Sequence, residues 1–291
     1  MRILVTGAAG YIGSALVRAL AGHEVLATDQ SAPSPIIGNL AYPPFARSLV
    51  TPEIDAVFHL ASLVSGGAEQ SFELGMKVNL DATRDLLEAC RLAGHRPKFI
   101  FTSSIAVYSN VGDVTDATPP APKLSYGAQK LVCEILLEEY TRRGYVQGCA
   151  LRLPTVMVRP GGANTAVSGW ASAIIREPLA GRDYVCPVRP DTRMACISIN
   201  KVVAALLHAQ RHSGTVLLTG IPVSAQQMWD AVKERATGTV RFEPDPALQP
   251  IMDRVPGSTS SARAAELGFP HSKDILEIVR EYEEAALAHH G

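Results

Sequence analysis

Short apolar runs alternate with longer amphipathic stretches through the first half of the chain. The runs are rich in β-branched and aromatic side chains and predict buried strands at 2–6, 24–28, 56–60, 98–102 and 147–153. Between them, apolar residues recur at helical spacing and predict helices at 11–20, 72–93 and 126–142. Strands that alternate with helices of this length indicate βαβ units. The expected fold is therefore α/β, with a doubly wound parallel sheet.

The second half of the chain is less regular. Its pattern predicts strands at 193–199 and 215–219 and helices at 167–176, 200–208, 225–235 and 275–288. Asn200 and Ser224 are the expected caps of two of these helices. We expect residues 1–155 to form one domain, to which 193–219 return, and 156–192 and 220–291 to form a smaller C-terminal lobe.

Composition excludes several classes of function. The 291 residues carry 27 Lys and Arg against 28 Asp and Glu, so no basic field exists to attract nucleic acid or an anionic membrane. No run approaches the roughly 20 apolar residues of a membrane span, and the N-terminus lacks the pattern of a signal peptide. The five cysteines form no CxxC pair and are expected to be buried free thiols rather than disulfides or metal ligands. We expect a soluble cytoplasmic protein.

A glycine-rich turn joins the first strand to the first helix. Gly7, Gly10 and Gly13 form a GxxGxxG pattern, which suits a tight turn, a close approach of a pyrophosphate and close packing of the helix on the strand. Asp29 ends the second strand, where a carboxylate can accept hydrogen bonds from the adenosine ribose and repel a 2′-phosphate. This favours NAD over NADP. A plain tight turn, with Asp29 as a turn former, remains the alternative.

A second constellation follows the strand FIFTSS. Tyr126 and Lys130 are four residues apart, so they share one face of a helix, and Ser104 ends the preceding strand. A phenol is a weak base at neutral pH, and a neighbouring ammonium favours its phenolate form. We expect Tyr126 to exchange a proton with a substrate hydroxyl and Ser104 to orient the same oxygen. Lys130 is expected to lower the pKa of Tyr126 and to hold the nicotinamide ribose. An amphipathic pair at a helix start is the alternative.

Together these segments resemble the extended short-chain dehydrogenase/reductase family, which includes NAD-dependent epimerases and dehydratases. The resemblance is carried by GAAGYIG, Asp29, HLAS, VNL, FTSS and the Tyr126–Lys130 pair, and it spans nearly the whole chain. It implies a Rossmann domain and a catalytic set of Ser104, Tyr126 and Lys130. It also implies that Tyr126 and Lys130 bind NAD. The other residues implied in NAD binding are Gly7, Gly10, Tyr11, Ile12, Gly13, Asp29, Leu60, Ala61, Ser62, Asn79, Pro154 and Val156.

Within that family, the segments around HLASLVSGGAE, RLPTVMVRPGG and PVRPDTR are most similar to enzymes of a four-carbon sugar acid. This similarity implies NAD-dependent oxidation at C2 to the 2-keto acid. A nucleotide-sugar epimerase or dehydratase that retains its NAD is one alternative, and a non-catalytic NAD sensor is another. Residues 30–50 depart from the family because they lack the Asp-containing turn that often holds adenine.

An acid substrate needs a cationic partner, for which Arg is suited. Arg193 matches a position where related epimerases place a phosphate-binding Arg, and Arg159 and Arg189 are weaker candidates. Ser65, Asn164 and Ser168 lie in segments that could reach the substrate, although solvation of a loop is the favoured interpretation for each. No metal site is expected. By analogy with the family, the helices at 72–93 and 125–143 could pair with a second copy to form a homodimer.

Overall fold

The computed structural model describes residues 1–109, 112–162 and 166–288. It divides into two compact units. The first contains 1–107, 122–152 and 203–216, and the second contains 108–121, 153–202 and 217–291.

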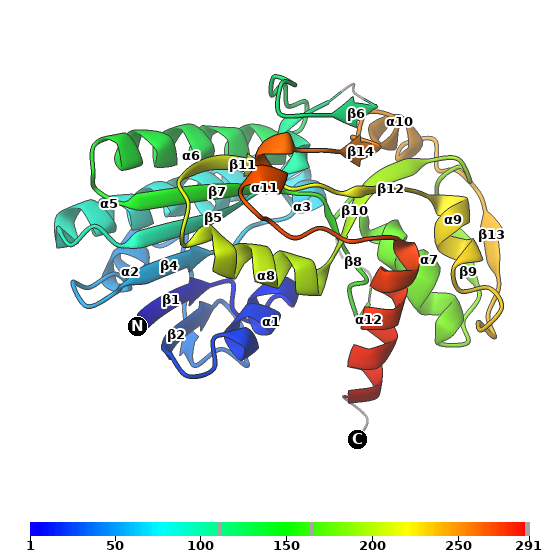
Figure 1. The fold of residues 1–291 in the computed structure, drawn as a ribbon, viewed down its shortest axis with the longest axis horizontal. Coiled ribbons are helices and arrows are strands. Elements are labelled where there is room, and N and C mark those ends of the chain that lie inside the picture. Colours follow the sequence, from blue (N-terminus) through cyan, green and yellow to red (C-terminus); the bar gives the residue numbers. More distant parts are fainter. Residues whose placement is uncertain (110–111, 163–165, 289–291) are drawn as a thin grey trace. The chain divides into compact units, whose positions relative to one another are not determined.

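A seven-stranded sheet forms the centre of the first unit, in the order β11–β7–β5–β4–β1–β2–β3 (Figure 1). The chain leaves the central strand β1 in one direction to β2 and returns on its other side to β4 and β5, and these four strands run parallel. The carboxyl edge near β1 and β4 is where doubly wound sheets bind ligands. The strands are β1 (Arg2–Thr6), β2 (Glu24–Asp29), β3 (Ile36–Ile37), β4 (Ala56–His59), β5 (Lys98–Ser104), β7 (Gln147–Leu153) and β11 (Gly214–Leu217).

Apolar helix faces and continuous apolar strands make the core of this unit. Leu86 and Leu87 of α5 and Leu137 of α6 pack with Phe99 and Phe101 of β5 in one buried cluster. Strands buried on both faces need such unbroken apolar runs, which is why their sequences predicted them well. The helical elements are α1 (Tyr11–Ala19), α2 (Pro43–Ser48), α3 (Ser65–Gln70), α4 (Phe72–Gly75), the π-helical turn η1 (Met76–Asp81), α5 (Ala82–Ala93), the 3₁₀ turn η2 (Ile105–Val107) and α6 (Ser125–Arg142).

The second unit is built from small sheets and helices. A three-stranded sheet has the order β12–β10–β8, and two pairs join β13 to β9 and β14 to β6. The strands are β6 (Asp113–Val114), β8 (Thr155–Met157), β9 (Tyr184–Cys186), β10 (Arg193–Ser198), β12 (Ile221–Ser224), β13 (Val240–Phe242) and β14 (Ser258–Thr259). The helices are α7 (Gly169–Leu179), α9 (Ala225–Asp230), α10 (Gln249–Met252), α11 (Ala262–Glu266) and α12 (Ile275–Ala288), while α8 (Ile199–Ala209) crosses the boundary between the units.

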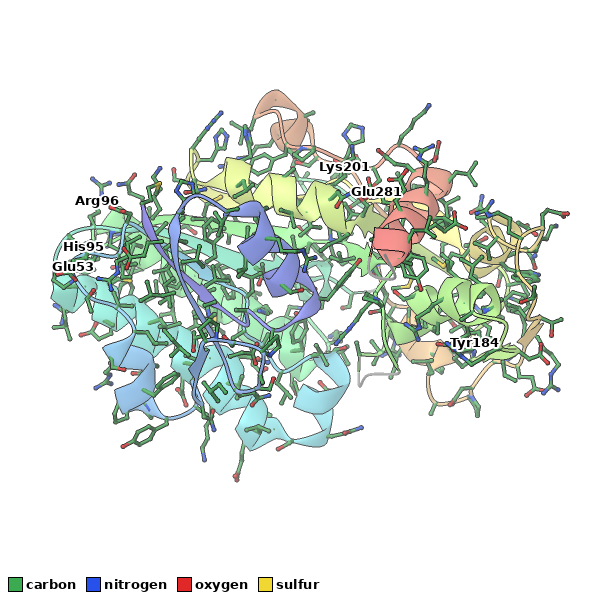
Figure 2. All side chains as sticks on the ribbon, turned by 90° about the horizontal axis from the view of Figure 1, so that it is seen from below. Glu53, His95, Arg96, Tyr184, Lys201 and Glu281 are labelled. Atoms are coloured by element: carbon green, nitrogen blue, oxygen red, sulfur yellow. The ribbon has the colours of Figure 1, made fainter. Side chains whose placement is uncertain are left out.

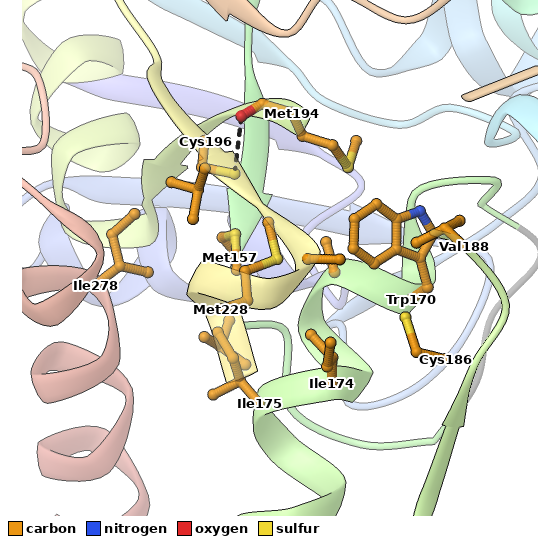
Figure 3. Packing of buried hydrophobic residues seen from close by; sticks show 14 of the residues in the cluster. Met157, Trp170, Ile174, Ile175, Cys186, Val188, Met194, Cys196, Met228 and Ile278 are labelled. Atoms are coloured by element: carbon orange, nitrogen blue, oxygen red, sulfur yellow. Dashed lines mark hydrogen bonds between the residues drawn. The ribbon is translucent and has the colours of Figure 1, made fainter. Parts of the chain in front are cut away.

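Trp170 and Ile174 of α7 pack with Met194 and Cys196 of β10 in the core of the second unit (Figure 3). All five cysteines of the chain, Cys90, Cys133, Cys149, Cys186 and Cys196, are buried and free, as their apolar surroundings predicted. No helix of the described residues is both long and apolar enough to cross a membrane.

Several predicted elements differ in detail from the observed ones. The helix predicted at 72–93 is divided by the wide turn Met76–Asp81. The helix predicted at 200–208 begins one residue earlier, and Ser198, not Asn200, caps it by accepting a hydrogen bond from the Lys201 N–H at 3.2 Å. Ser224 does cap a helix, through a reciprocal capping box with Gln227, but that helix ends at Asp230 rather than at 235. Tertiary contacts decide such boundaries more than local propensity does.

Candidate active site

The glycine turn between β1 and α1 lies directly against the segment that follows β4. Gly7 has a φ of +72°, and a Cβ atom there would lie 2.6 Å from the Ala61 nitrogen. At Gly13 a Cβ would lie 2.0 Å from the Gly7 carbonyl oxygen, so the helix can approach the turn only without a side chain. Helix α1 has no side-chain cap and no acidic residue in its first turn, which leaves its N-terminus suited to an anion.

Asp29 is held beside this turn at the end of β2. Its Oδ2 accepts a hydrogen bond from the Ala9 N–H at 3.0 Å, and its Oδ1 accepts one from the Ser31 N–H at 3.3 Å. A carboxylate fixed next to a glycine turn and an open helix N-terminus is the arrangement that a dinucleotide requires for its ribose and its pyrophosphate. The residues present therefore fit NAD.

Asn79 fixes the segment after β4 from within the π-helical turn. It is 1% exposed, and its Oδ1 accepts hydrogen bonds from the Leu63 N–H at 2.7 Å and the Ser62 hydroxyl at 3.0 Å. Its Nδ2 donates to the Leu63 carbonyl at 3.0 Å and to Gln129 Oε1 at 2.7 Å. Every hydrogen-bonding position of this amide is thus used. The wider winding of the π-helical turn η1 changes the direction of the Asn79 side chain from that in a regular α-helix.

Tyr126 and Lys130 lie on α6 beside the end of β5. Lys130 is 2% exposed, and its Nζ donates to the Thr102 carbonyl at 2.8 Å. The same ammonium lies 4.6 Å from the ring centre of Phe101 and 5.6 Å from that of Tyr126. The Tyr126 hydroxyl has the hydroxyls of Ser62 and Ser104 as hydrogen-bonding neighbours. The structure therefore brings together the three residues of the predicted catalytic set, with Ser62 beside them.

Burial shifts both titrating groups toward their neutral forms. Desolvation raises the pKa of Tyr126, and the hydrogen bonds to Ser62 and Ser104 offset only part of that rise. Desolvation also lowers the pKa of Lys130 to about 8, although the carboxylate of Glu134 opposes this shift. The phenol is therefore protonated at neutral pH, and the ammonium beside it loses its proton in mildly basic solution.

Two contacts that the sequence analysis missed set the position of α6. The Glu69 carboxylate accepts a hydrogen bond from the Ser125 N–H, at the first turn of a helix that has no side-chain cap of its own. At Gly127 a Cβ would lie 2.0 Å from the Ala106 carbonyl oxygen, so only glycine allows α6 to approach η2 this closely. No local pattern reveals Glu69, which is 56 residues from its partner, whereas the glycine that follows Tyr126 was a visible signal.

The other predicted residues divide between the units. In the first, Tyr11 and Ile12 open α1, Leu60 and Ala61 follow β4, and Ser65 is buried at the start of α3.

In the second unit, Pro154 packs against Gly220, Val156 pairs with Ile197 of β10, and Arg193 is exposed at the start of β10. Arg189 is ion-paired with Asp253 at 2.7 Å, and the backbone N–H of Arg159 donates a hydrogen bond to the Ser172 hydroxyl. Ser168 precedes α7, and Asn164 lies outside the described residues.

At the opposite, amino edge of the sheet, a small polar group has a structural role. His95 Nε2 contacts the Ile54 carbonyl oxygen at 2.6 Å, and Figure 2 shows Glu53 and Arg96 beside it. Because doubly wound sheets bind ligands at their carboxyl edge, this group is not part of the candidate site.

Comparison with known proteins places these features in a family. A model of the NAD-dependent epimerase/dehydratase family matches residues 3–217. The chain is 39% identical to D-erythronate dehydrogenase from Cupriavidus necator, with 99% of this chain and 100% of that protein covered. It is 34% identical to D-erythronate dehydrogenase from Haemophilus influenzae, over 97% and 98% of the two chains. A solved nucleoside-diphosphate-sugar epimerase from Agrobacterium tumefaciens superposes with a TM-score of 0.90 at 33% identity, covering 99% and 95%.

Proposed function

The chain belongs to the NAD-dependent epimerase/dehydratase family, and from that premise we propose that it oxidises the C2 hydroxyl of a small sugar acid, such as D-erythronate, to the 2-keto acid. The family and the dehydrogenase relatives make NAD the cofactor and oxidation the reaction class. The observation that carries the catalytic assignment is the cluster of Ser104, Tyr126 and Lys130 at the carboxyl end of β5.

NAD, held against the glycine turn and Asp29, would supply the acceptor for the hydride from C2. The proton of the C2 hydroxyl goes to the Tyr126 oxygen, and Ser104 donates a hydrogen bond to the substrate oxygen and orients it. Lys130 places a positive charge near the Tyr126 ring, which favours the phenolate, and it is held for this role by the Thr102 carbonyl. In this proposal the first unit binds the cofactor through Gly7, Gly10, Gly13, Asp29 and the segment 60–62.

Recognition of the acid group is assigned to Arg193 in this proposal. Arg193 is exposed and is not among the ion-paired arginines of the described residues, in contrast to Arg189, so its guanidinium is available to a carboxylate. Such a pair would be bidentate and would reject substrates that lack the acid group. Ser65 is the proposed partner of a further substrate hydroxyl.

A nucleotide-sugar epimerase is the second candidate, favoured by the close superposition on a solved epimerase. That reaction would oxidise and then reduce the sugar at one carbon and return NAD unchanged. The two candidates share Tyr126 and Lys130, so the site's own proton chemistry does not separate them.

The test incubates the protein with NAD and a panel of four- and five-carbon sugar acids and nucleotide sugars, and follows NADH by absorbance. We expect net NADH with a sugar acid and a keto acid as product. Isomerised nucleotide sugar with no net NADH would replace the dehydrogenase by the epimerase. Binding of NAD with no reaction on either class would leave a cofactor-sensing role in place of both.

We further propose that the protein is a homodimer. Phe72 of α4, Leu92 of α5 and Val132 and Ile135 of α6 are large apolar side chains that are exposed on the first unit. Contact with a second copy would remove them from water. Light scattering coupled to size exclusion should give twice the 31.0 kDa chain mass, and Ile135→Glu should give the monomer.

A further inference from the structure

His59 ends β4 in the interior of the first unit and hydrogen-bonds through both ring nitrogens. It is 1% exposed. Its Nδ1 lies 2.7 Å from the Thr6 hydroxyl, and its Nε2 lies 2.8 Å from the Thr83 hydroxyl.

The neighbouring bonds determine the direction of each of these contacts. The Thr83 hydroxyl donates its one proton to the Asn79 carbonyl at 2.7 Å, so toward the imidazole it can only accept, and His59 Nε2 carries a proton. On the other side the Thr6 hydroxyl accepts from the Ala61 N–H at 3.3 Å and is free to donate to His59 Nδ1. In a neutral imidazole these bonds select the tautomer that carries its proton on Nε2.

These bonds form one continuous chain that begins and ends on the same segment. It runs from the Ala61 N–H through Thr6, His59 and Thr83 to the backbone of Asn79. The Asn79 side chain then returns to Ser62 and Leu63. The segment 60–63 is thus held by a closed circuit of hydrogen bonds, and Thr6, which belongs to this circuit, directly precedes Gly7.

We propose that His59 is a positioning residue for NAD, because it closes the ring of hydrogen bonds that fixes segment 60–63 against the glycine turn. The inference rests on the proposed function only in that NAD is taken to lie against these two segments. Small displacements of groups that contact a ligand reduce binding and rate strongly, so a rigid link between the two segments has a direct effect on the cofactor.

The surroundings of His59 also require that it stay neutral. Its ring stacks on Phe101 at 5.8 Å between centres, and the Lys130 ammonium lies 4.6 Å from the centre of the same Phe101 ring. Burial, together with the charge of Lys130, lowers the pKa of His59 to about 3. A second cation at His59 would be repelled by the Lys130 ammonium. A neutral imidazole supplies a donor and an acceptor without adding charge.

The test uses Thr-to-Val substitutions, which keep the shape of the side chain and remove one hydroxyl. Thr6→Val and Thr83→Val each remove one of the two hydrogen bonds that the His59 imidazole makes. Thr28→Val is the matched control: Thr28 lies opposite Thr6 in the neighbouring strand, is fully buried, and its hydroxyl has no hydrogen-bond partner among the described residues. Thr83→Ser is a second control, because serine keeps the hydroxyl and loses only the methyl group. Binding of NAD is measured by calorimetry, and the melting temperature is measured without NAD.

We expect Thr6→Val and Thr83→Val each to weaken NAD binding about tenfold, since each leaves a buried ring nitrogen without its partner. The double variant should be weaker than either single variant by less than about threefold, because one break already opens the ring. Thr83→Ser and Thr28→Val should bind NAD within about twofold of the parent chain.

Two results would overturn this inference and leave the proposed function standing. One is parental NAD affinity in Thr83→Val while the melting temperature falls, which would leave His59 a purely structural residue. The other is an equal loss of NAD affinity in Thr28→Val, which would show that removing any buried hydroxyl nearby weakens binding, whether or not it bonds to His59. Failure of the parent chain to bind NAD would instead overturn the proposed function, and this inference with it.

Discussion

Two glycines of the first turn should separate folding from cofactor binding. At Gly13 a Cβ would lie 2.0 Å from the Gly7 carbonyl oxygen, whereas ordinary contacts begin at 3.4 Å, so α1 or the turn would have to move by more than an ångström. Forced overpacking of this kind costs about 1–3 kcal/mol. At about 2–4 °C per kcal/mol for a chain of this size, Gly13→Ala should lower the melting temperature by roughly 2–12 °C.

Gly10→Ala should behave differently. Gly10 has an extended conformation, with φ −71° and ψ 169°, which alanine adopts without strain. Its added Cβ would meet one atom within 4 Å, the Gly7 carbonyl oxygen at 3.2 Å, and would otherwise face open space. The cost to folding should stay below about 1 kcal/mol. The methyl group would stand where a pyrophosphate must approach the backbone, so NAD affinity should fall about tenfold or more.

Differential scanning fluorimetry without NAD and calorimetry with NAD measure the two effects on the same preparations. The two variants should differ in kind: Gly13→Ala should be less stable than the parent chain, and Gly10→Ala should be stable but bind NAD weakly. Parental stability of Gly13→Ala would refute the packing argument. Parental NAD affinity of Gly10→Ala would show that the pyrophosphate does not lie against this turn.

Three further predictions concern single side chains. Tyr126→Phe should lower kcat at least about 100-fold while NAD affinity, measured by calorimetry, stays near that of the parent chain; near-parental turnover would remove Tyr126 from the mechanism. Arg193→Ala should raise KM for the sugar acid strongly without changing NAD binding, and an unchanged KM would reject its role. Because the pKa of His59 is about 3 in the folded chain against 6.5 ordinarily, the unfolded chain binds the extra proton. Stability should therefore fall as pH falls below about 6.5, by about 1.4 kcal/mol at pH 5.5, and urea unfolding of His59→Gln should lack that part of the loss.

The sequence predicted the sheet better than it predicted the joints between elements. Strands such as Arg2–Thr6 and Gln147–Leu153 were predicted with their observed bounds, because each contains consecutive buried apolar residues, at 3–5 and 149–151, as a strand covered on both faces needs. The wide turn at Met76–Asp81 was not predicted, since a single π-helical turn barely disturbs helical spacing. Ser198 and Asn200 are both good caps, and the end of β10 at Ser198 decides between them.

The same limit applies to the candidate site. Glycine spacing and the Tyr126–Lys130 interval are local patterns, so the sequence pointed to them directly. The contacts that hold them are not local: Glu69 reaches Ser125 across 56 residues, and Thr6 reaches His59 across 53. Such pairs depend on the order of strands in the sheet, which a single sequence does not encode in any short window.

The charge state of the site has a consequence for when Tyr126 can act. Burial raises the pKa of Tyr126 and lowers that of Lys130 to about 8, so without cofactor both shifts oppose the ion pair that proton abstraction needs. A phenolate in this position requires a further positive charge nearby, and oxidised nicotinamide carries one. Tyr126 should therefore lose its proton at lower pH in the NAD complex than in the free chain. Ultraviolet titration of the parent against Tyr126→Phe, with and without NAD, measures this difference, and the same titration midpoint in both states would mean that Lys130 alone sets the pKa of the base.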